Sequence, residues 1–203
     1  MTSNNEIKRI VVVGAGGVGF WSSVILARES MGRVVQVWDD DTFEGGNGFQ
    51  RLPRVSTPSQ FKTSFLRGFV GMAMGDTPPE VVSRRFSPEE IRGLGGFSTT
   101  LIVDATDMPL EPRRLLWEAA QAAGAILVRG SYDGNGACIV AWGLPWASAR
   151  ALEGGYSQVP TLAQSFTIAG ILVQAVHKFL RTGEQEQVVV RIEPGGSVNN
   201  VSS

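Results

Sequence analysis

The stretch Arg9–Gly19, with the sequence RIVVVGAGGVG, directs the fold of this 203-residue chain. Its first half is a β-branched run without a polar interruption after the arginine, which is typical of a strand buried on both faces of a parallel sheet. Its second half has the spacing Gly-x-Gly-x-x-Gly, and a helix is predicted to follow over residues 18–31 and to end at Gly32. A strand, a glycine loop and a helix in this order predict the first unit of a Rossmann-like fold.

The glycine loop also predicts a phosphate site. Glycines let the backbone approach phosphate oxygens closely, and the N-terminus of the following helix offers free N–H groups with a partial positive charge. Asp39 follows Gly19 by 20 residues, at the end of a second strand predicted over 33–38, where a carboxylate accepts hydrogen bonds from a ribose. The residues expected to bind a nucleotide are therefore Gly14, Gly16, Gly17, Gly19 and Asp39.

Strands and helices are predicted to alternate along the rest of the chain. This alternation favours an α/β fold, with a Rossmann-like, doubly wound, mostly parallel sheet in a single domain. Further strands are predicted over residues 80–85, 99–103, 125–129, 137–142 and 187–192, and further helices over 57–75, 111–123 and 161–181. Thr57 is the expected N-cap of the first of these helices, and Pro58 its first residue. We expect the nucleotide-binding domain to span residues 1–193 and the Gly-, Ser- and Asn-rich residues 194–203 to form a disordered tail.

Composition excludes several classes of protein. The chain has 18 basic and 19 acidic residues, a formal net charge of −1 and no basic block, so neither nucleic acid nor a membrane is an expected partner. Its most apolar stretch, residues 166–180, is interrupted by polar residues and is too short for a membrane span. Residues 1–8 lack the apolar core of a signal peptide, and we expect a soluble, cytoplasmic protein.

Two acidic segments that follow predicted strands bear on the choice of ligand. Residues 39–51 have the sequence DDDTFEGGNGFQR, and residues 101–107 are a strand that ends in DATD. Carboxylates at the strand ends where open α/β sheets bind their ligands suit an ATP–magnesium site better than a hydride-transfer site. An NAD(P)-binding oxidoreductase is the usual interpretation of such a glycine loop and stays open as an alternative.

With these segments the chain resembles the ThiF/MoeB family of enzymes that activate ubiquitin-like proteins. The resemblance covers about residues 7–142, with a weaker match over 161–181. It depends on four elements: the GAGGVG loop, the acidic segment with Asn47 and Gln50-Arg51, the downstream Lys62, and the DATD strand end. One of these alone is a weak signal, whereas their order and spacing together are specific.

The resemblance implies an adenylyltransferase that uses ATP and Mg²⁺ to transfer AMP onto the C-terminal carboxylate of a small, ubiquitin-like carrier protein or of a peptide. Carried over by position, Asp39 holds the ribose, Asn47 and Lys62 contact the phosphates, and Asp107 holds the magnesium ion. The carboxylate and the α-phosphate are both anionic, so cations must screen them before they meet. No protein nucleophile is required, because the step depends on positioning and charge neutralisation.

The chain departs from the family pattern in the acidic segment. The family has arginine and then glutamine where this chain has Gln50 and then Arg51. We expect Arg51 to take over the role at the phosphates, so that the catalytic residues are Arg51, Lys62 and Asp107. Asp41 and Gln50, from the same segment, are expected to contribute to nucleotide binding.

Other departures concern elements that are expected to be absent. The family's helix before the first strand, with an arginine that reaches a partner's site, is not expected here, although the resemblance still implies a homodimer. Cys138 is the only cysteine and lies in an apolar strand, so we expect no disulfide, no cysteine-built zinc site and no catalytic cysteine. These departures keep a third alternative open, a non-catalytic member of the family that binds a partner protein.

Overall fold

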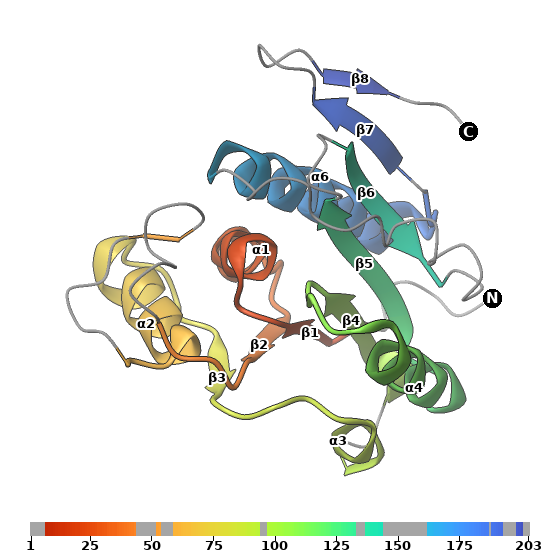
Figure 1. The fold of residues 1–203 in the computed structure, drawn as a ribbon, viewed down its shortest axis with the longest axis horizontal. Coiled ribbons are helices and arrows are strands. Elements are labelled where there is room, and N and C mark those ends of the chain that lie inside the picture. The colour runs from red at the N-terminus through yellow and green to blue at the C-terminus, as the bar shows by residue number, and fades with distance from the viewer. Residues whose placement is uncertain are drawn as a thin grey trace.

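A twisted sheet forms the centre of the molecule (Figure 1). The computed structural model describes residues 7–43, 52–53, 59–93, 97–132, 137–143, 162–186, 188–192 and 198–200, and within them the strand order is β3-β2-β1-β4-β5-β6-β7-β8. The strands are β1 (Arg9–Val13), β2 (Val34–Trp38), β3 (Glu80–Val82), β4 (Thr100–Asp104), β5 (Ile126–Tyr132), β6 (Ala137–Trp142), β7 (Val188–Ile192) and β8 (Val198–Asn200). The pairings from β3 to β5 are parallel and those from β5 to β8 are antiparallel.

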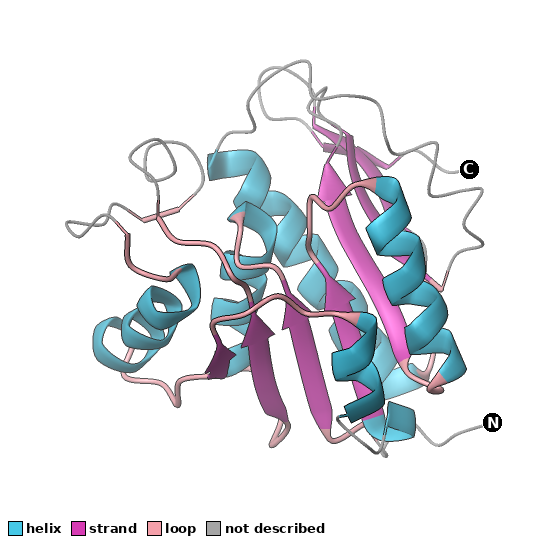
Figure 2. Cartoon of the chain, turned by 60° about the horizontal axis from the view of Figure 1, so that its bottom comes forward, coloured by secondary structure: helices cyan, strands magenta, loops and turns pink. Residues whose placement is uncertain are grey.

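Helices cover both faces of this sheet (Figures 1 and 2), which confirms the predicted doubly wound α/β fold. One face packs against α1 (Gly17–Arg28), α6 (Leu162–Thr182) and α2 (Lys62–Gly68), which continues as a π-helix over Phe69–Ala73. The other face packs against α3 (Pro88–Gly93) and α4 (Leu110–Ala122), and a short 3-10 turn (Phe97–Thr99) leads into β4. None of these described helices is long and apolar enough to cross a membrane.

The first strand is buried on both faces, as its sequence predicts. Ile10 and Val12 belong to the apolar cluster on the α1 and α6 side, whereas Val11 and Val13 belong to the cluster on the α3 and α4 side. None of the four side chains is more than 2% exposed. Successive side chains of a strand point to opposite faces, so a strand between two helical layers must be apolar at every position.

The helix predicted over residues 57–75 begins later than expected. Thr57 and Pro58 lie outside the described residues, but Ser59 and Gln60 are not helical, and α2 begins at Lys62. The reason is a tertiary contact: the backbone N–H of Phe43 donates to the carbonyl of Gln60, and that of Ser59 donates to the carbonyl of Phe43. These bonds hold the segment beside the chain that leaves β2 and prevent it from entering a helix.

Part of the C-terminal segment forms a strand, although the sequence predicts a disordered tail there. Val198–Asn200, within residues 194–203, form β8, which pairs with β7. An edge strand presents a row of unpaired N–H and C=O groups, and even a Gly- and Asn-rich segment can satisfy them with its backbone.

The order of the strands reverses between β1 and β4. From β1 the chain proceeds outward to β2 and β3, then returns to the other side of β1 to form β4 and β5. In open α/β sheets the crevice at such a reversal, beyond the carboxyl ends of the strands, binds the ligand. Here the loops that leave β1 and β4 are in contact, since a Cβ added at Gly14 would lie only 2.9 Å from the carbonyl oxygen of Ala105.

Gly19 tests the packing of this crevice. A Cβ at Gly19 would lie 1.8 Å from the carbonyl oxygen of Gly14, a backbone atom that is fixed by the glycine loop. We expect Gly19→Ala to lower the free energy of unfolding by about 3 kcal/mol, because the added methyl group overpacks the site where α1 meets the loop.

Gly16 provides the matched control, since it lies in the same loop, has an ordinary φ of −71° and has no atom within 4 Å of the position that a Cβ would take. Urea unfolding followed by circular dichroism measures both variants. Equal loss of stability in Gly16→Ala and Gly19→Ala would contradict the steric argument.

Candidate nucleotide-binding site

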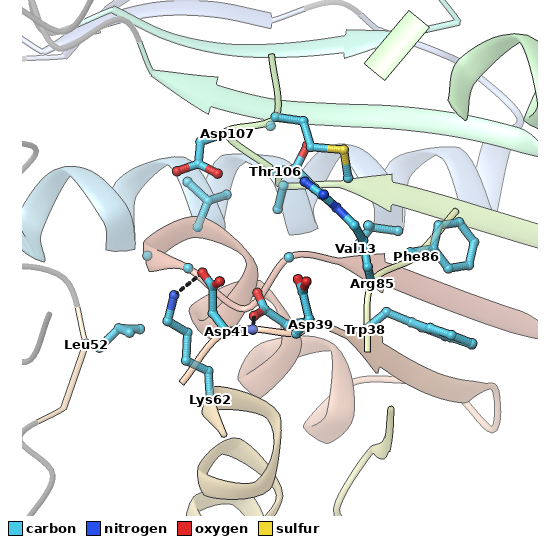
Figure 3. A pocket seen from close by; sticks show the side chains of 18 of the residues that line it. Val13, Trp38, Asp39, Asp41, Leu52, Lys62, Arg85, Phe86, Thr106 and Asp107 are labelled. Carbon is cyan, nitrogen blue, oxygen red and sulfur yellow. Dashed lines mark hydrogen bonds and ion pairs between the residues drawn. The ribbon is translucent and has the colours of Figure 1, made fainter. Parts of the chain in front are cut away.

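A cavity of about 460 Å³ lies at the carboxyl ends of β1, β2 and β4 (Figure 3). Most of the residues predicted from the sequence line it together: Gly14, Gly16, Gly17, Asp39, Asp41, Lys62 and Asp107. Gly19 does not line it, since its place is against the backbone of Gly14 underneath. The cavity therefore lies where the reversal of strand order places a ligand.

The glycine loop presents backbone to this cavity. Gly14 has a φ of +93°, which favours glycine, and its N–H donates to the carbonyl of Trp38 at 2.8 Å. Gly16 is the N-cap of α1 and supplies no side-chain cap. The first-turn amides of this 12-residue helix are thus suited to bind an anion, such as a phosphate, at the cavity.

Asp39 joins the end of β2 to the glycine loop. One carboxylate oxygen accepts a hydrogen bond from the backbone N–H of Ala15 at 2.5 Å, and the other accepts from the N–H of Asp41 at 2.7 Å. Burial raises the pKa of Asp39, although the two backbone N–H groups and the Lys62 ammonium oppose this shift. The carboxylate predicted to bind a ribose therefore also holds the loop, and it lines the cavity.

Lys62 is a buried cation in the wall of the cavity. Its Nζ lies 2.6 Å from the Oδ2 of Asp41, and its backbone N–H donates to the carbonyl of the same residue. The Lys62 side chain is 9% exposed, against 65% for Asp41. A lysine on a helix is usually a solvated surface charge, but here the bridge to Asp41 holds the ammonium group at a cavity that it lines.

The two carboxylates of the DATD strand end have different environments. Asp104 is fully buried, and its Oδ2 accepts from Arg129 Nη1 at 2.9 Å and from Trp117 Nε1 at 3.0 Å. Asp107 is exposed and faces the cavity from the side opposite the Asp41–Lys62 pair (Figure 3). Of these two carboxylates, Asp107 is therefore the one available to a ligand, while Asp104 is structural.

Asp104 is ionised in the interior because its partners outweigh its desolvation. Burial by itself raises the pKa of Asp104, but the Arg129 charge and the hydrogen bonds from Trp117 and Thr106 together leave that pKa lowered. Its contribution to stability is consequently present above the pKa of about 3.9 in the unfolded chain and is lost as the pH falls through the lower pKa of the folded state.

Asp104→Asn tests this ionisation. At pH 7 we expect the variant to be less stable than the wild type by about 3 kcal/mol, because a buried Arg129 loses its counter-ion. As the pH falls below about 3.9 the difference should shrink, because Asp104 takes up a proton in the unfolded wild-type chain while the folded carboxylate is still ionised, and this lowers the stability of the wild type until the folded carboxylate is protonated as well. Urea midpoints measured from pH 7 to pH 2.5 provide the comparison, and a difference that stays constant over this range would contradict an ionised Asp104.

Three residues of the predicted site, Asn47, Gln50 and Arg51, lie outside the described residues. Their roles at the phosphates, including the substitution of Arg51 for the family's arginine, stay predictions.

Arg85 is a cavity residue that the sequence reasoning passed over. It follows β3, and its side chain points into the cavity toward Thr106 (Figure 3). The adjacent Arg84 is engaged elsewhere, with an ion pair to Glu90 at 3.1 Å and its guanidinium carbon 5.1 Å from the centroid of the Trp38 ring. The signal for Arg85 was available: it follows the carboxyl end of a parallel strand, the same edge on which Asp39 and Asp107 lie.

A cluster of three carboxylates and the separate carboxylate of Asp107 could each hold a metal ion at the cavity. Oxygens of Asp39, Asp40 and Asp41 lie within 4.8 Å of one another. However, Asp39 accepts two backbone hydrogen bonds and Asp41 pairs with Lys62, so this group is already neutralised in part. Asp107 has only its own carboxylate to offer, which fits Mg²⁺ when substrate phosphates and water complete the coordination.

Comparison with solved structures shows which known proteins share this fold. MccB of E. coli, solved with AMPCPP and MccA, aligns with a TM-score of 0.73 at 14% sequence identity over 98% of this chain and 65% of MccB. MccB solved with ATP aligns with a TM-score of 0.72 at 14% identity over 98% and 65% of the two chains. PaaA aligns with a TM-score of 0.70 at 14% identity over 98% and 64%.

These similarities show a shared fold. This chain spans about 65% of the length of the MccB chains. The sequence matches no protein-family model and no curated protein.

Proposed function

We propose that this chain is an ATP-dependent adenylyltransferase that activates the C-terminal carboxylate of a small protein or peptide. The observation that carries the proposal is the placement of Lys62 and Asp107 on opposite sides of one cavity, above a helix N-terminus that lacks a side-chain cap. A cation, a metal-binding carboxylate and free backbone N–H groups converge there on the volume that a triphosphate needs.

The chemistry follows from this arrangement. A carboxylate oxygen of the substrate attacks the α-phosphorus of ATP, the bond from that phosphorus to the bridging oxygen breaks, and pyrophosphate leaves with the electron pair. The product is an acyl-adenylate. Lys62 would neutralise charge on the phosphates, Asp107 would hold the Mg²⁺ ion, and Asp39 would orient the ribose. Mg²⁺ would supply additional charge stabilisation of the leaving pyrophosphate.

The structures that share this fold support adenylyl transfer over hydride transfer. MccB has been solved with ATP, with AMPCPP and MccA, and with N-formylated MccA, so this fold accommodates a nucleoside triphosphate in MccB. A homodimer, a cytoplasmic location, and the action of Asn47, Gln50 and Arg51 at the phosphates belong to the same proposal, on the resemblance alone.

Nucleotide titration tests the ligand. We expect the wild type to bind ATP more tightly with Mg²⁺ than without it, and more tightly than NADH under either condition. Gly16→Ala should weaken ATP binding by about tenfold, roughly 1.4 kcal/mol, because the new methyl group projects where phosphate oxygens approach the backbone. Isothermal titration calorimetry measures the affinities. Tight, magnesium-independent NADH binding would replace this proposal with the oxidoreductase alternative.

Pyrophosphate exchange tests the reaction. A peptide library with free C-terminal carboxylates, incubated with the protein, ATP, Mg²⁺ and labelled pyrophosphate, should yield labelled ATP, whereas C-terminally amidated peptides should not. Asp107→Asn should reduce the exchange rate by about a hundredfold or more, through loss of the metal's charge stabilisation.

Asp40→Asn is the matched control for this variant, because Asp40 also lines the cavity but belongs to the other carboxylate group. We expect Asp40→Asn to retain most of the exchange. If it abolished exchange while Asp107→Asn did not, the metal would be assigned to the group around Asp40. Nucleotide binding without exchange for any peptide would favour the non-catalytic alternative.

A further inference from the structure

Arg129 is a buried guanidinium group beneath the cavity that no part of the proposed reaction uses. It lies in β5, its side chain is 8% exposed, and it does not line the cavity, although Gly130 and Ser131 immediately after it do. A buried charge of this kind needs strong partners, because removing it from water is expensive. Its partners show what it holds in place.

The guanidinium of Arg129 bridges a strand end and the loop that follows it. Nη1 donates to Oδ2 of Asp104 at 2.9 Å, and Nη2 donates to the backbone carbonyl of Thr106 at 3.4 Å. The other oxygen of Asp104 accepts from the backbone N–H of Thr106 at 3.0 Å and from its hydroxyl at 2.7 Å. Thr106 is thus held at its N–H, its hydroxyl and its carbonyl, and the next residue is Asp107.

Helix α4 holds the other side of the same loop. Arg113 Nη2 donates to the carbonyl of Met108, and its Nε lies 4.0 Å from Oδ2 of Asp104. Trp117 Nε1 donates to the same carboxylate oxygen at 3.0 Å. The residues on both sides of Asp107 are consequently fixed by one buried polar network centred on Asp104.

Stability alone is a weak reason for such a network. A buried ion pair is often no more stabilising than apolar side chains of similar volume, because the desolvation of two charges offsets their attraction. What the network provides is geometry: its members converge on the backbone on both sides of the exposed carboxylate to which the proposed function assigns a metal ion. A metal site loosened by a fraction of an ångström loses affinity, and partners of this kind commonly set that geometry.

We propose that Arg129 is a positioning residue, which acts through Asp104 and Thr106 to set the place of the Asp107 carboxylate and thereby the metal affinity of the nucleotide complex. The inference rests on the proposed function for the metal at Asp107, but the ordering of the loop by Arg129 can be measured without any ligand. Arg129 itself touches neither nucleotide nor metal.

Three variants separate positioning from stability. Arg129→Met removes the guanidinium and leaves Asp104 with a weaker set of partners. The double variant Arg129→Met with Asp104→Asn removes both charges, so its melting temperature should lie closer to that of the wild type. Leu127→Ala is the matched control, since Leu127 is a buried apolar residue of β5 two positions away on the same face of the sheet, and its loss creates a cavity without affecting the polar network.

The first readout is hydrogen–deuterium exchange of the peptide that covers residues 105–109 in the ligand-free protein. We expect Arg129→Met and the double variant to speed exchange there by tenfold or more, and Leu127→Ala to leave that segment like the wild type. The second readout is the Mn²⁺ dissociation constant of the ATP complex, which should rise about tenfold in both Arg129 variants. The affinity for ATP without metal should change less than twofold, because the glycine loop is untouched.

Each outcome bears on one claim. The double variant could recover the wild-type melting temperature and, with it, the Mn²⁺ affinity and the slow exchange of the loop. That result would overturn the inference, because Arg129 would then be merely structural. The inference would also be overturned if Leu127→Ala and Arg129→Met lost the same amount of stability and raised the Mn²⁺ dissociation constant of the ATP complex equally. If the wild type binds ATP without any dependence on metal, the metal assignment of the proposed function fails, and the inference about metal affinity fails with it. In that case faster hydrogen–deuterium exchange over residues 105–109 in the Arg129 variants would still show that Arg129 orders the loop, independently of any metal ion.

Discussion

The parallel register of β1 with its two neighbours is the constraint on which the site depends. Val13, the last residue of β1, pairs with Trp38 at the end of β2 and with Asp104 at the end of β4. Three chain segments therefore leave the sheet at the same level and in the same direction. Gly14, Asp39 and Ala105 are adjacent for this reason alone, although they come from distant parts of the sequence. A shift of one residue in either pairing would separate the glycine loop from its carboxylates.

Close packing at this edge explains why the loop has glycine at positions 14 and 19. The backbones after β1 and β4 approach within van der Waals distance at Gly14 and Ala105, and α1 begins directly against the same loop at Gly19. Asp39 then fastens the loop from the β2 side through the N–H of Ala15. The backbone of the glycine loop is consequently held in place before a ligand arrives, which reduces the entropy lost on binding.

The charges around the cavity are divided between structural and available groups. Asp104 and Arg129 neutralise each other in the interior, whereas Lys62 is paired with Asp41 and also lines the cavity. The groups left facing the cavity include the Arg85 guanidinium and the Asp107 carboxylate. The proposed reaction, which brings a triphosphate and a second anion together, benefits from this division, because the buried Asp104–Arg129 pair sets positions while the groups at the cavity supply the electrostatic complement.

Local patterns in the sequence were enough to predict the Rossmann-like fold, the glycine loop and the strand-end carboxylates Asp39 and Asp107, whereas Lys62, which lines the same cavity, was predicted only from the family resemblance. They were enough because a buried parallel strand must be apolar throughout, and because glycine spacing and strand-end carboxylates are local features with fixed consequences.

Other features came only from the assembled chain. Asp104 and Asp107 are three positions apart in a single DATD motif, and only the contacts of β4 with β5 and α4 make one of them a buried partner of Arg129 and the other a cavity residue. The start of α2 at Lys62 likewise depended on backbone bonds to residues 41–43. Burial and long-range hydrogen bonds are properties of the folded molecule, so no local pattern of residues could have supplied them.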